Sequence, residues 1–422
     1  MDTKNFLQEV ADRFGTPSFL YDIDVIRDQY LALRKLLAPC CDIFYSMKAN
    51  PLLAICEYFH HLGAQCEVSS KNELFTALTA GFTSEQIIFV GPGKNQSELE
   101  LAVEKNIKAI ICESIDEFML VNKIAHAQNK MIKVMARINP DFTVNHAPMK
   151  MTGVASQFGI STDIFIKNKN LIKKCTNIKL EGIQIYNATR ILNPRSIIDN
   201  IEKILLLAQS LSEEYGCAWK YVDFGGGFGI PYFENEKQLS IPELICHLNC
   251  VLLQYKNHFP STQFILELGR YLVAESGYLI SRVQAIKTNH QKNYIVIDAG
   301  MDCLYFASSM GSFVHRNFQA DSISITPRSD TQEIYHVAGP LCTPGDILLK
   351  NISLHKVSVE DLIIIKNAGA YGPTASVGRF LSRGMPAEVI RHDHFLYLCK
   401  RREEIGDILT TQYSHKKIFN NY

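Results

Sequence analysis

The stretch Asp42-Ile-Phe-Tyr-Ser-Met-Lys-Ala-Asn-Pro51 changes at Lys48 from an apolar, aromatic run to the start of a helical segment. The run is typical of a buried strand, and Ala-Asn-Pro is typical of a helix start. This order of strand and helix recurs up to about residue 267. The β-rich runs number eight: Asp42 to Met47, Ala64 to Val68, Ile87 to Val90, Ala109 to Cys112, Lys133 to Ile138, Ile178 to Tyr186, Lys220 to Phe224 and Gln263 to Glu267. Eight strand–helix units predict a parallel (β/α)₈ TIM barrel, with a doubly wound open sheet as the structural alternative.

Helix start signals between these runs support the same fold. Ser97-Glu-Leu-Glu100 and Ser114-Ile-Asp-Glu117 both fit the capping box. In that motif a serine side chain accepts a free backbone N–H, and a glutamate three residues later accepts the N–H of the serine. We therefore expect a helix to begin at each of the two serines.

After about residue 275 the β-rich runs follow one another without helices between them. These runs are Tyr278 to Ala285, Tyr294 to Asp298, Glu333 to Ala338, Leu362 to Lys366, Glu388 to Arg391 and Phe395 to Cys399. They predict a separate all-β domain of residues 276–422, which residues 1–23 join through the run Ser18 to Asp22, while the barrel spans residues 24–275. The polar stretches Lys287 to Asn293 and Thr326 to Gln332 are expected to be loops.

Composition favours an ordered globular protein with a small-molecule ligand. The 422 residues are 47% apolar, and Lys plus Arg equals Asp plus Glu at 43 each, so no surplus charge favours nucleic acid or an anionic membrane. The sequence shows neither a signal-like start nor a long apolar span, and its 12 cysteines lack paired spacings. We expect a cytoplasmic protein with reduced thiols. Cys246-x₃-Cys250 has no second ligand cluster and favours helix packing over a metal site.

Reactive residues close several of the predicted strands, where barrels place their chemistry. These residues are Lys48, Glu67, Arg137, Tyr186, Gly225 to Gly227 and Glu267. Lys48, partly desolvated at its strand end, would be a better amine and suits a Schiff base. The glycines let backbone N–H groups approach a phosphate. Glu267 would keep a pyridine ring protonated, and Arg270 would neutralise phosphate.

Each of these features has a structural alternative when it is taken alone. A lysine at a strand end is more often simply exposed, and a glycine run is more often a turn. Glu267 and Arg270 fit surface ion pairs equally well. Further along, Cys342 and Tyr371 lie in loop-like segments, and a cysteine flanked by Gly, Pro and Thr is expected to be accessible and able to transfer a proton.

Taken together, the motifs resemble the fold-type III pyridoxal-phosphate decarboxylases. This family contains the diaminopimelate, ornithine and arginine decarboxylases, and its barrel is related to that of alanine racemase. The similar segments cover nearly the whole chain: the Lys48 strand, Arg137-Ile-Asn-Pro, Gln157-Phe-Gly, Gly225-Gly-Gly, Glu267-x-Gly-Arg270, Asp298-Ala-Gly-Met, Gly339-Pro-x-Cys and Gly369-Ala-Tyr. The resemblance implies a decarboxylase with pyridoxal 5′-phosphate as cofactor, in a head-to-tail homodimer with shared active sites.

The resemblance also implies a role for individual residues. Lys48 would bond to the cofactor and Glu267 would face its pyridine nitrogen. Cys342, supplied by the other subunit, would donate the proton that replaces CO₂. The further cofactor contacts that it implies are Arg137, Tyr186, Thr189, Gly226, Gly227, Gly269, Arg270 and Tyr371.

Three departures from the family pattern bear on the substrate. Diaminopimelate decarboxylases have His-x-His-Ile-Gly-Ser-Gln where this chain has Gln184-Ile-Tyr-Asn-Ala-Thr-Arg190, and their acidic residue after the cysteine is Thr343 here. Their Arg-Pro-x-Leu-Tyr segment is replaced by Met301-Asp-Cys-Leu-Tyr-Phe. Free diaminopimelate therefore fits poorly. Candidate substrate contacts are Arg316, Thr343 and Asp346.

Within the family, the similarity is closer to a member that acts on glutamate tethered to an acyl-carrier protein. The segments that carry it are Ile88-Phe-Val-Gly-Pro-Gly-Lys94, Met151-Thr-Gly-Val, Gln157-Phe-Gly and Gly339-Pro-Leu-Cys-Thr-Pro344. A carrier-bound glutamyl substrate is thus one expectation. The alternatives are a diaminopimelate decarboxylase of lysine biosynthesis and, from a different class, a catalytically silent cofactor-binding regulatory protein.

Overall fold

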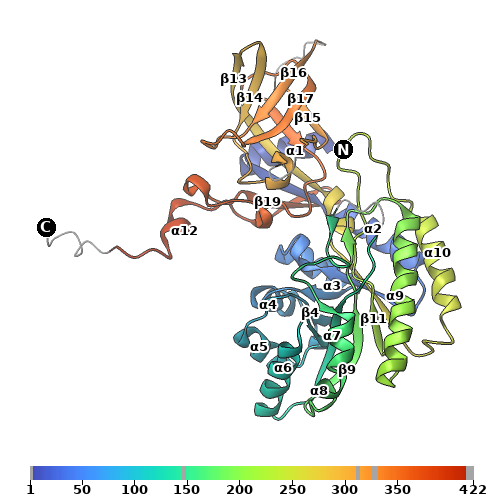
Figure 1. The fold of residues 1–422 in the computed structure, drawn as a ribbon. Helices are drawn as coiled ribbons and strands as arrows, with labels where there is room; N and C mark the ends of the chain where they lie inside the picture. The colour runs from blue at the N-terminus through green and yellow to red at the C-terminus, as the bar shows by residue number, and fades with distance from the viewer. Residues whose placement is uncertain (1–2, 145–148, 310–313, 326–330, 415–422) are drawn as a thin grey trace. The chain divides into compact units, whose positions relative to one another are not determined.

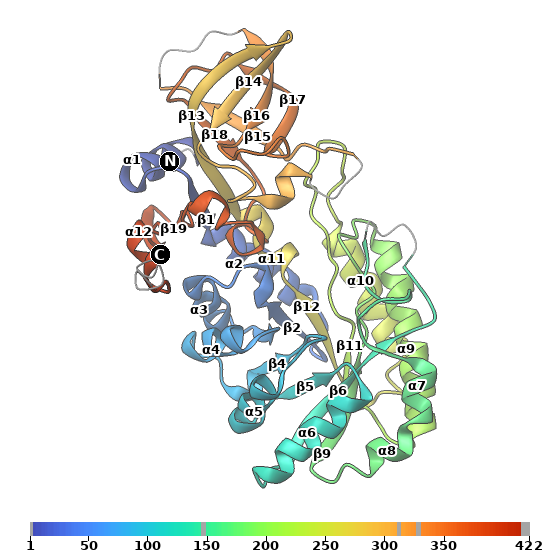
Figure 2. The same cartoon turned by 60° about the vertical axis from the view of Figure 1, so that its left-hand side comes forward.

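The computed structural model describes residues 3–144, 149–309, 314–325 and 331–414 of the chain. The chain divides into two compact units, each described here by itself. The barrel unit contains residues 25–231 and 235–274. The β unit contains residues 1–24, 232–234 and 275–422. Figures 1 and 2 show the elements of both units.

Eight parallel strands of the barrel unit pair in a closed ring, which confirms the predicted barrel and excludes the open sheet. Each strand pairs with the next in chain order, and β12 returns to pair with β2, Phe264 opposite Cys41. The strands are β2 (Cys41–Ser46), β3 (Gln65–Val68), β4 (Ile87–Phe89), β5 (Ala109–Cys112), β6 (Ile132–Asn139), β9 (Ile178–Gln184), β11 (Tyr221–Asp223) and β12 (Gln263–Leu268). The short strands are β7 (Met149–Lys150), β8 (Ile160–Ser161) and β10 (Ala188–Thr189).

Helices cover the outside of the barrel, as Figure 2 shows. They are α2 (Ile23–Leu36), α3 (Leu53–His61), α4 (Lys71–Thr79), α5 (Gln96–Lys105), α6 (Ile115–Ala127), α7 (Thr162–Lys167), α8 (Lys169–Lys173), α9 (Pro194–Tyr215), α10 (Ile241–Gln254) and α11 (Arg270–Val273). Phe44 on β2 and Met135 on β6 belong to one buried apolar cluster. Because these strands are not neighbours, their side chains meet across the interior, which is a packed core rather than a pore.

One predicted helix start is wrong and the other is half right. Helix α5 is capped by Asn95, whose side chain accepts the Glu98 N–H while Glu98 accepts the Asn95 N–H, so the capping box begins two residues before Ser97. Ser114 does cap α6. Its expected partner Glu117 instead accepts the backbone N–H of Glu113, at 2.7 Å.

The β unit is a β-sheet into which the N-terminal strand is inserted. Strand β1 (Ser18–Asp22) pairs antiparallel with β13 and parallel with β19, as the sequence predicted for this run. The other strands are β13 (Gly277–Asn289), β14 (Lys292–Ile297), β15 (Ala320–Ile323), β16 (Gln332–Ala338), β17 (Ile347–His355), β18 (Leu362–Ile365), β19 (Ala387–His392) and β20 (Phe395–Lys400). Helices α1 (Thr3–Phe14) and α12 (Ile405–Leu409) complete the unit.

Two predictions for this unit need correction. The stretch Lys287 to Asn293, expected to be a loop, is the end of a β13–β14 hairpin, because His290 and Gln291 alone form the turn with positive φ angles of 47° and 62°. Strands β15 and β17 were not predicted. The expected loop Thr326 to Gln332 lies outside the described residues for 326–330, and Gln332 begins β16.

The core of the β unit forms between α1 and the sheet. Phe6, Leu7 and Val10 of the helix are buried in one cluster with Leu20 of β1 and Ile364 of β18. Among the described residues, no helix is long and apolar enough to cross a membrane.

Candidate active site

The predicted barrel-unit residues gather at the carboxyl ends of the parallel strands, so the closed ring of strands brings them to one end of the barrel. Lys48 lies in a 3₁₀ turn, Met47–Ala49, that directly follows β2. Arg137 lies near the end of β6, Gln184 ends β9, Asp223 ends β11 and Glu267 lies near the end of β12. Residues far apart in the sequence thus form one polar cluster.

Lys48 is held by a buried carboxylate on the neighbouring strand. Its Nζ lies 3.0 Å and 2.9 Å from the two carboxylate oxygens of Glu67, and the Ser69 hydroxyl donates to the same carboxylate at 2.7 Å. Burial by itself would raise the pKa of Glu67, but the Lys48 ammonium outweighs it and the pKa is lowered. The side chain of Lys48 remains 35% exposed, so its amine can be reached by a ligand.

A second group of buried acids lies on the opposite side of the strand that carries Lys48. Gln184 Nε2 donates to Glu267 at 2.7 Å, and Asp223 accepts the Gly225 N–H at 2.7 Å. Burial and then the charge of Glu67 raise the pKa of Glu267 to about 7. Burial and then the charge of Glu267 raise the pKa of Asp223 well above its usual range. The carboxyl groups of Asp223 and Glu267 therefore both hold a proton more tightly than an ordinary exposed carboxyl group does.

The glycines after β11 let two strand ends pack against each other. A Cβ on Gly226 would lie 1.9 Å from the Glu267 carbonyl oxygen, which no side chain could tolerate. Gly227 has a φ of +100°, and a Cβ there would meet the Ala188 carbonyl oxygen at 2.3 Å. The backbone of this loop is thus fixed close to the backbone of β12 at Glu267, and its glycines present no Cβ that would obstruct a phosphate.

Arg137 is buried in an ion pair that the sequence analysis missed. Its Nη1 lies 2.9 Å from Glu113, which follows β5, and both side chains are at most 4% exposed. The same carboxylate accepts the backbone N–H groups of Gly91 at 3.0 Å and Gly159 at 3.2 Å. Glu113 therefore ties three strand-end loops to Arg137. The Nε of Arg137 is buried without a hydrogen-bond partner among the described residues.

The other predicted cofactor contacts of the barrel unit surround these groups. Tyr186 packs so closely that a Cβ on Gly225 would lie 2.7 Å from it. Thr189 lies in β10, opposite Met149. Gly269 precedes α11, which begins at Arg270, and a Cβ on it would lie 2.7 Å from Ala49 Cβ, so this loop lies directly against the turn of Lys48.

The remaining predicted residues belong to loops of the β unit. Cys342 is exposed, whereas Asp346 is buried and accepts the backbone N–H groups of Met301 and Leu341 at 2.7 Å and 2.8 Å. Asp346 thus fixes the loop that carries Cys342, and its contact with substrate stays a prediction. The Tyr371 backbone has a φ of +55°, and its ring meets Phe306 edge-on at 6.1 Å. Arg316 is exposed, with its guanidinium 5.4 Å from the centre of the Phe233 ring.

Three buried polar residues of this cluster were not predicted as site residues: Glu113, Gln184 and Asp223. Each ends or follows an apolar strand, which is the signal that singled out Lys48 and Glu267. A search for every polar residue at a predicted strand end would have found them. As a whole, the cluster offers one amine, several buried carboxyl groups and a glycine-lined loop, which suits covalent capture of a phosphorylated ligand.

Comparison with known proteins agrees with this geometry. Residues 23–274 match the family model "Pyridoxal-dependent decarboxylase, pyridoxal binding domain". The chain is 35% identical over 406 residues to the L-glutamyl-[BtrI acyl-carrier protein] decarboxylase of Niallia circulans, covering 96% of this chain and 95% of that protein. It is 31% identical to the diaminopimelate decarboxylase of Aquifex aeolicus over 404 residues, covering 96% and 93%.

A solved structure is similar over the same length. The crystal structure of the diaminopimelate decarboxylase from M. jannaschii in complex with L-lysine matches with a TM-score of 0.89 and 27% identity, covering 97% of this chain and 94% of that one. The predicted family and the barrel-plus-β architecture are confirmed. The chain belongs to the pyridoxal-dependent decarboxylases and is a carboxy-lyase of the family that includes the diaminopimelate decarboxylases.

Proposed function

We propose that this chain removes the α-carboxylate of a glutamyl group carried on an acyl-carrier protein, with pyridoxal 5′-phosphate bound to Lys48. The proposed substrate rests on the 35% identity, over 96% of the chain, to a decarboxylase that acts on such a substrate. Several relatives are diaminopimelate decarboxylases, which makes free diaminopimelate the competing substrate.

The residues present fit the cofactor. Glu67, Asp223 and Glu267 are buried and interact electrostatically with one another, and Lys48 pairs with Glu67, so a further positive charge, such as a protonated pyridine nitrogen, would be stabilised there. Gln184 Oε1 and Arg137 Nε are buried without hydrogen-bond partners among the described residues and are available to a polar ring. The loop at Gly226 and Gly227 leaves no side chain between its backbone and a phosphate.

In this assignment each contact has one task. Lys48 would hold the cofactor covalently, and Tyr186 would contact its ring. Glu267 would hold a proton on the ring nitrogen, and Arg137 would bond to a polar group of the ring. The phosphate is bound by Gly226, Gly227, Gly269 and Arg270 with Thr189 and Tyr371.

Decarboxylation requires an electron sink and a proton donor. When bound, pyridoxal phosphate accepts the electron pair that the departing CO₂ leaves on the α-carbon. Glu267 would stabilise that sink by holding a proton on the ring nitrogen. The Cys342 thiol, exposed on its loop, would donate a proton to the α-carbon, and the Lys48 amine would serve to release the product. Following the family resemblance, Cys342 acts in the site of the other subunit of a head-to-tail homodimer.

The test is an assay of CO₂ release by the purified protein, with its visible absorbance recorded first. We expect the absorbance band of lysine-bound pyridoxal phosphate, and release from glutamyl carrier protein but not from free glutamate or diaminopimelate. Release from free diaminopimelate would replace the proposed substrate with the competing one. Absence of the band in protein supplied with the cofactor would overturn the assignment of Lys48.

A further inference from the structure

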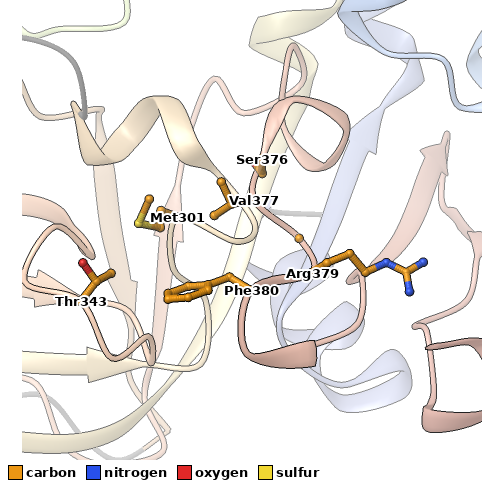
Figure 3. A pocket seen from close by; sticks show the side chains of 7 residues that line it. Met301, Thr343, Ser376, Val377, Arg379 and Phe380 are labelled. Atoms are coloured by element: carbon orange, nitrogen blue, oxygen red, sulfur yellow. The ribbon is translucent and has the colours of Figure 1, made fainter. Parts of the chain in front are cut away.

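A pocket in the β unit borders Thr343, the residue that follows the proposed proton donor. It encloses about 620 Å³, within the roughly 300–1,000 Å³ typical of small-molecule sites. Thr343, Met301, Val377, Phe380 and Arg379 line it. Figure 3 shows the Thr343, Met301, Val377 and Phe380 side chains around one space, with the Arg379 guanidinium directed away from Thr343.

The chemistry of the pocket changes along its length. Thr343 offers a hydroxyl at one end. The middle is apolar, and Val377 and Phe380 remain 39% and 41% exposed there, although side chains of this type are favourably buried. Arg379 also lines the pocket, and its guanidinium, 60% exposed, is directed away from Thr343 (Figure 3). The described residues that line the pocket include no carboxylate.

Hydrogen bonds hold the pocket wall in place. The Ser376 hydroxyl donates to the Gly372 carbonyl at 2.7 Å and accepts the Tyr305 N–H at 2.9 Å. Met301 accepts the Val377 N–H at 3.4 Å. The wall is therefore already formed, so a ligand loses little free energy in ordering it.

The guanidinium of Arg379 has N–H donors that its contact with Glu403 does not use. Its Nη2 lies 3.4 Å from Glu403, a long contact between partly exposed groups that contributes little to stability. A guanidinium has five N–H donors in a planar fork that matches phosphate oxygens. A phosphate could thus bind to Arg379 without a new buried charge.

We propose that this pocket binds the 4′-phosphopantetheine arm of an acyl-carrier protein, with its thioester end at Thr343 and its phosphate at Arg379. The inference rests on the proposed function and adds where the carrier is recognised. An arm of this kind is uncharged along its length and ends in a phosphate, which is the order of chemistry along the pocket. Free diaminopimelate carries both an ammonium group and a carboxylate at its distal end, and the lining residues have no carboxylate to pair with the ammonium group.

The experiment compares two substrates that share the reacting glutamyl thioester. One is glutamyl carrier protein, and the other is the glutamyl thioester of N-acetylcysteamine, which lacks the phosphate and most of the arm. For Arg379→Glu we expect KM for the carrier substrate to rise at least about tenfold, the effect of one lost charge-assisted hydrogen bond. The small thioester should change less than about twofold in kcat/KM, because it does not reach Arg379.

Further variants separate charge from shape. Arg379→Lys should restore most of the carrier KM, since the charge returns. Phe380→Asp should raise the carrier KM in the same way through the apolar middle of the pocket. Arg401→Glu makes the same charge reversal at an exposed site that does not line the pocket and should leave both substrates unchanged.

The outcomes separate the two proposals. If Arg379→Glu and Phe380→Asp both turned over the carrier substrate with the kcat and KM of the wild-type protein, the pocket assignment would be overturned but the proposed function would stand. Equal losses for both substrates would also overturn it, because the effect would then lie in the reaction and not in the arm. If the wild-type protein turned over neither substrate, the proposed function itself would fall, and the pocket assignment with it.

Discussion

The candidate site residues of the barrel unit and those of the β unit are held in opposite ways. In the barrel unit they lie at strand ends, are largely buried and bond to one another, as Lys48 bonds to Glu67 and Arg137 to Glu113. In the β unit Cys342 and Arg316 are exposed on loops, although Asp346, which fixes the Cys342 loop, is buried. This difference indicates a division of labour. The residues proposed to carry the chemistry are fixed by the rigid barrel, whereas the residues proposed to contact the substrate lie on exposed loops, where substitutions cost little stability.

The largest effect is expected at the centre of the barrel-unit cluster. Lys48→Ala should remove the visible cofactor absorbance and lower CO₂ release by roughly 10³-fold or more, beyond most losses of a single proton-transfer group. Lys48→Arg keeps a positive charge beside Glu67 but has no primary amine, so it should fail equally. A normal spectrum in either variant would show that another group holds the cofactor.

Cys342→Ala should keep the absorbance but lose turnover by roughly 10²–10⁴-fold, the contribution of a positioned proton donor. If the active site is shared between subunits, mixing this variant with Lys48→Ala should restore up to about a quarter of wild-type activity, because half of the dimers then contain one intact site. Mixed samples that stay inactive would place Cys342 outside the partner's site.

The buried ion pair provides the next effect, on stability. Glu113→Ala leaves the Arg137 charge buried and two loop N–H groups unpaired, which should cost about 3–5 kcal/mol in the free energy of unfolding. Glu9→Ala removes an exposed ion pair with Arg13 and should change it by less than about 0.5 kcal/mol. Urea unfolding measures both. Equal costs would contradict the contrast between buried and exposed pairs.

Asp223→Asn tests the proton held by the buried acids. Because the pKa of Asp223 is raised in the folded protein, its contribution to stability is complete at low pH and is lost as pH rises toward the folded pKa. Asparagine does not titrate. As pH rises above the ordinary pKa of an aspartate toward the folded pKa, the free energy of unfolding of the variant should therefore improve relative to wild type, by up to about 1 kcal/mol per pH unit.

The measurement for this variant is urea unfolding of cofactor-free protein at several pH values. The control is Val222→Ala on the same strand, which removes apolar packing and no titratable group. It should lower stability by a constant amount across this pH range. A constant difference for Asp223→Asn as well would show that Asp223 is ionised in the folded protein.

The smallest effect is expected in the loops of the β unit. Phe306→Leu removes the edge-on contact with Tyr371 and should cost at most about 1 kcal/mol, the usual value of such an aromatic pair. The cofactor would then be retained slightly less well, and dialysis followed by absorbance measures this. A loss as large as that of Glu113→Ala would show that the loop is as tightly constrained as the barrel.

Sequence patterns predicted the barrel well because its strands are continuous apolar runs buried on both faces. They failed where neighbours distant in the sequence decide the outcome. Nothing near Glu113 indicates that Arg137 and two loop N–H groups will meet it. Strand β17 was missed because it breaks the alternation expected of a strand: Leu348 and Leu349 are both buried, and Lys350 and Asn351 are both exposed. Ser97 was predicted as the helix cap because Ser-x-x-Glu fits the capping-box motif, but the helix begins two residues earlier and Asn95 caps it.

The insertion of β1 between β13 and β19 has a consequence for biosynthesis. Ser18 pairs with Ala387, so β1 leaves the ribosome long before its partner β19. At roughly 5–20 residues per second this delay is about 20–75 seconds. During that time the barrel can close, but β1 presents an unsatisfied strand edge. A nascent chain of this protein therefore has a built-in period in which chaperone protection matters most.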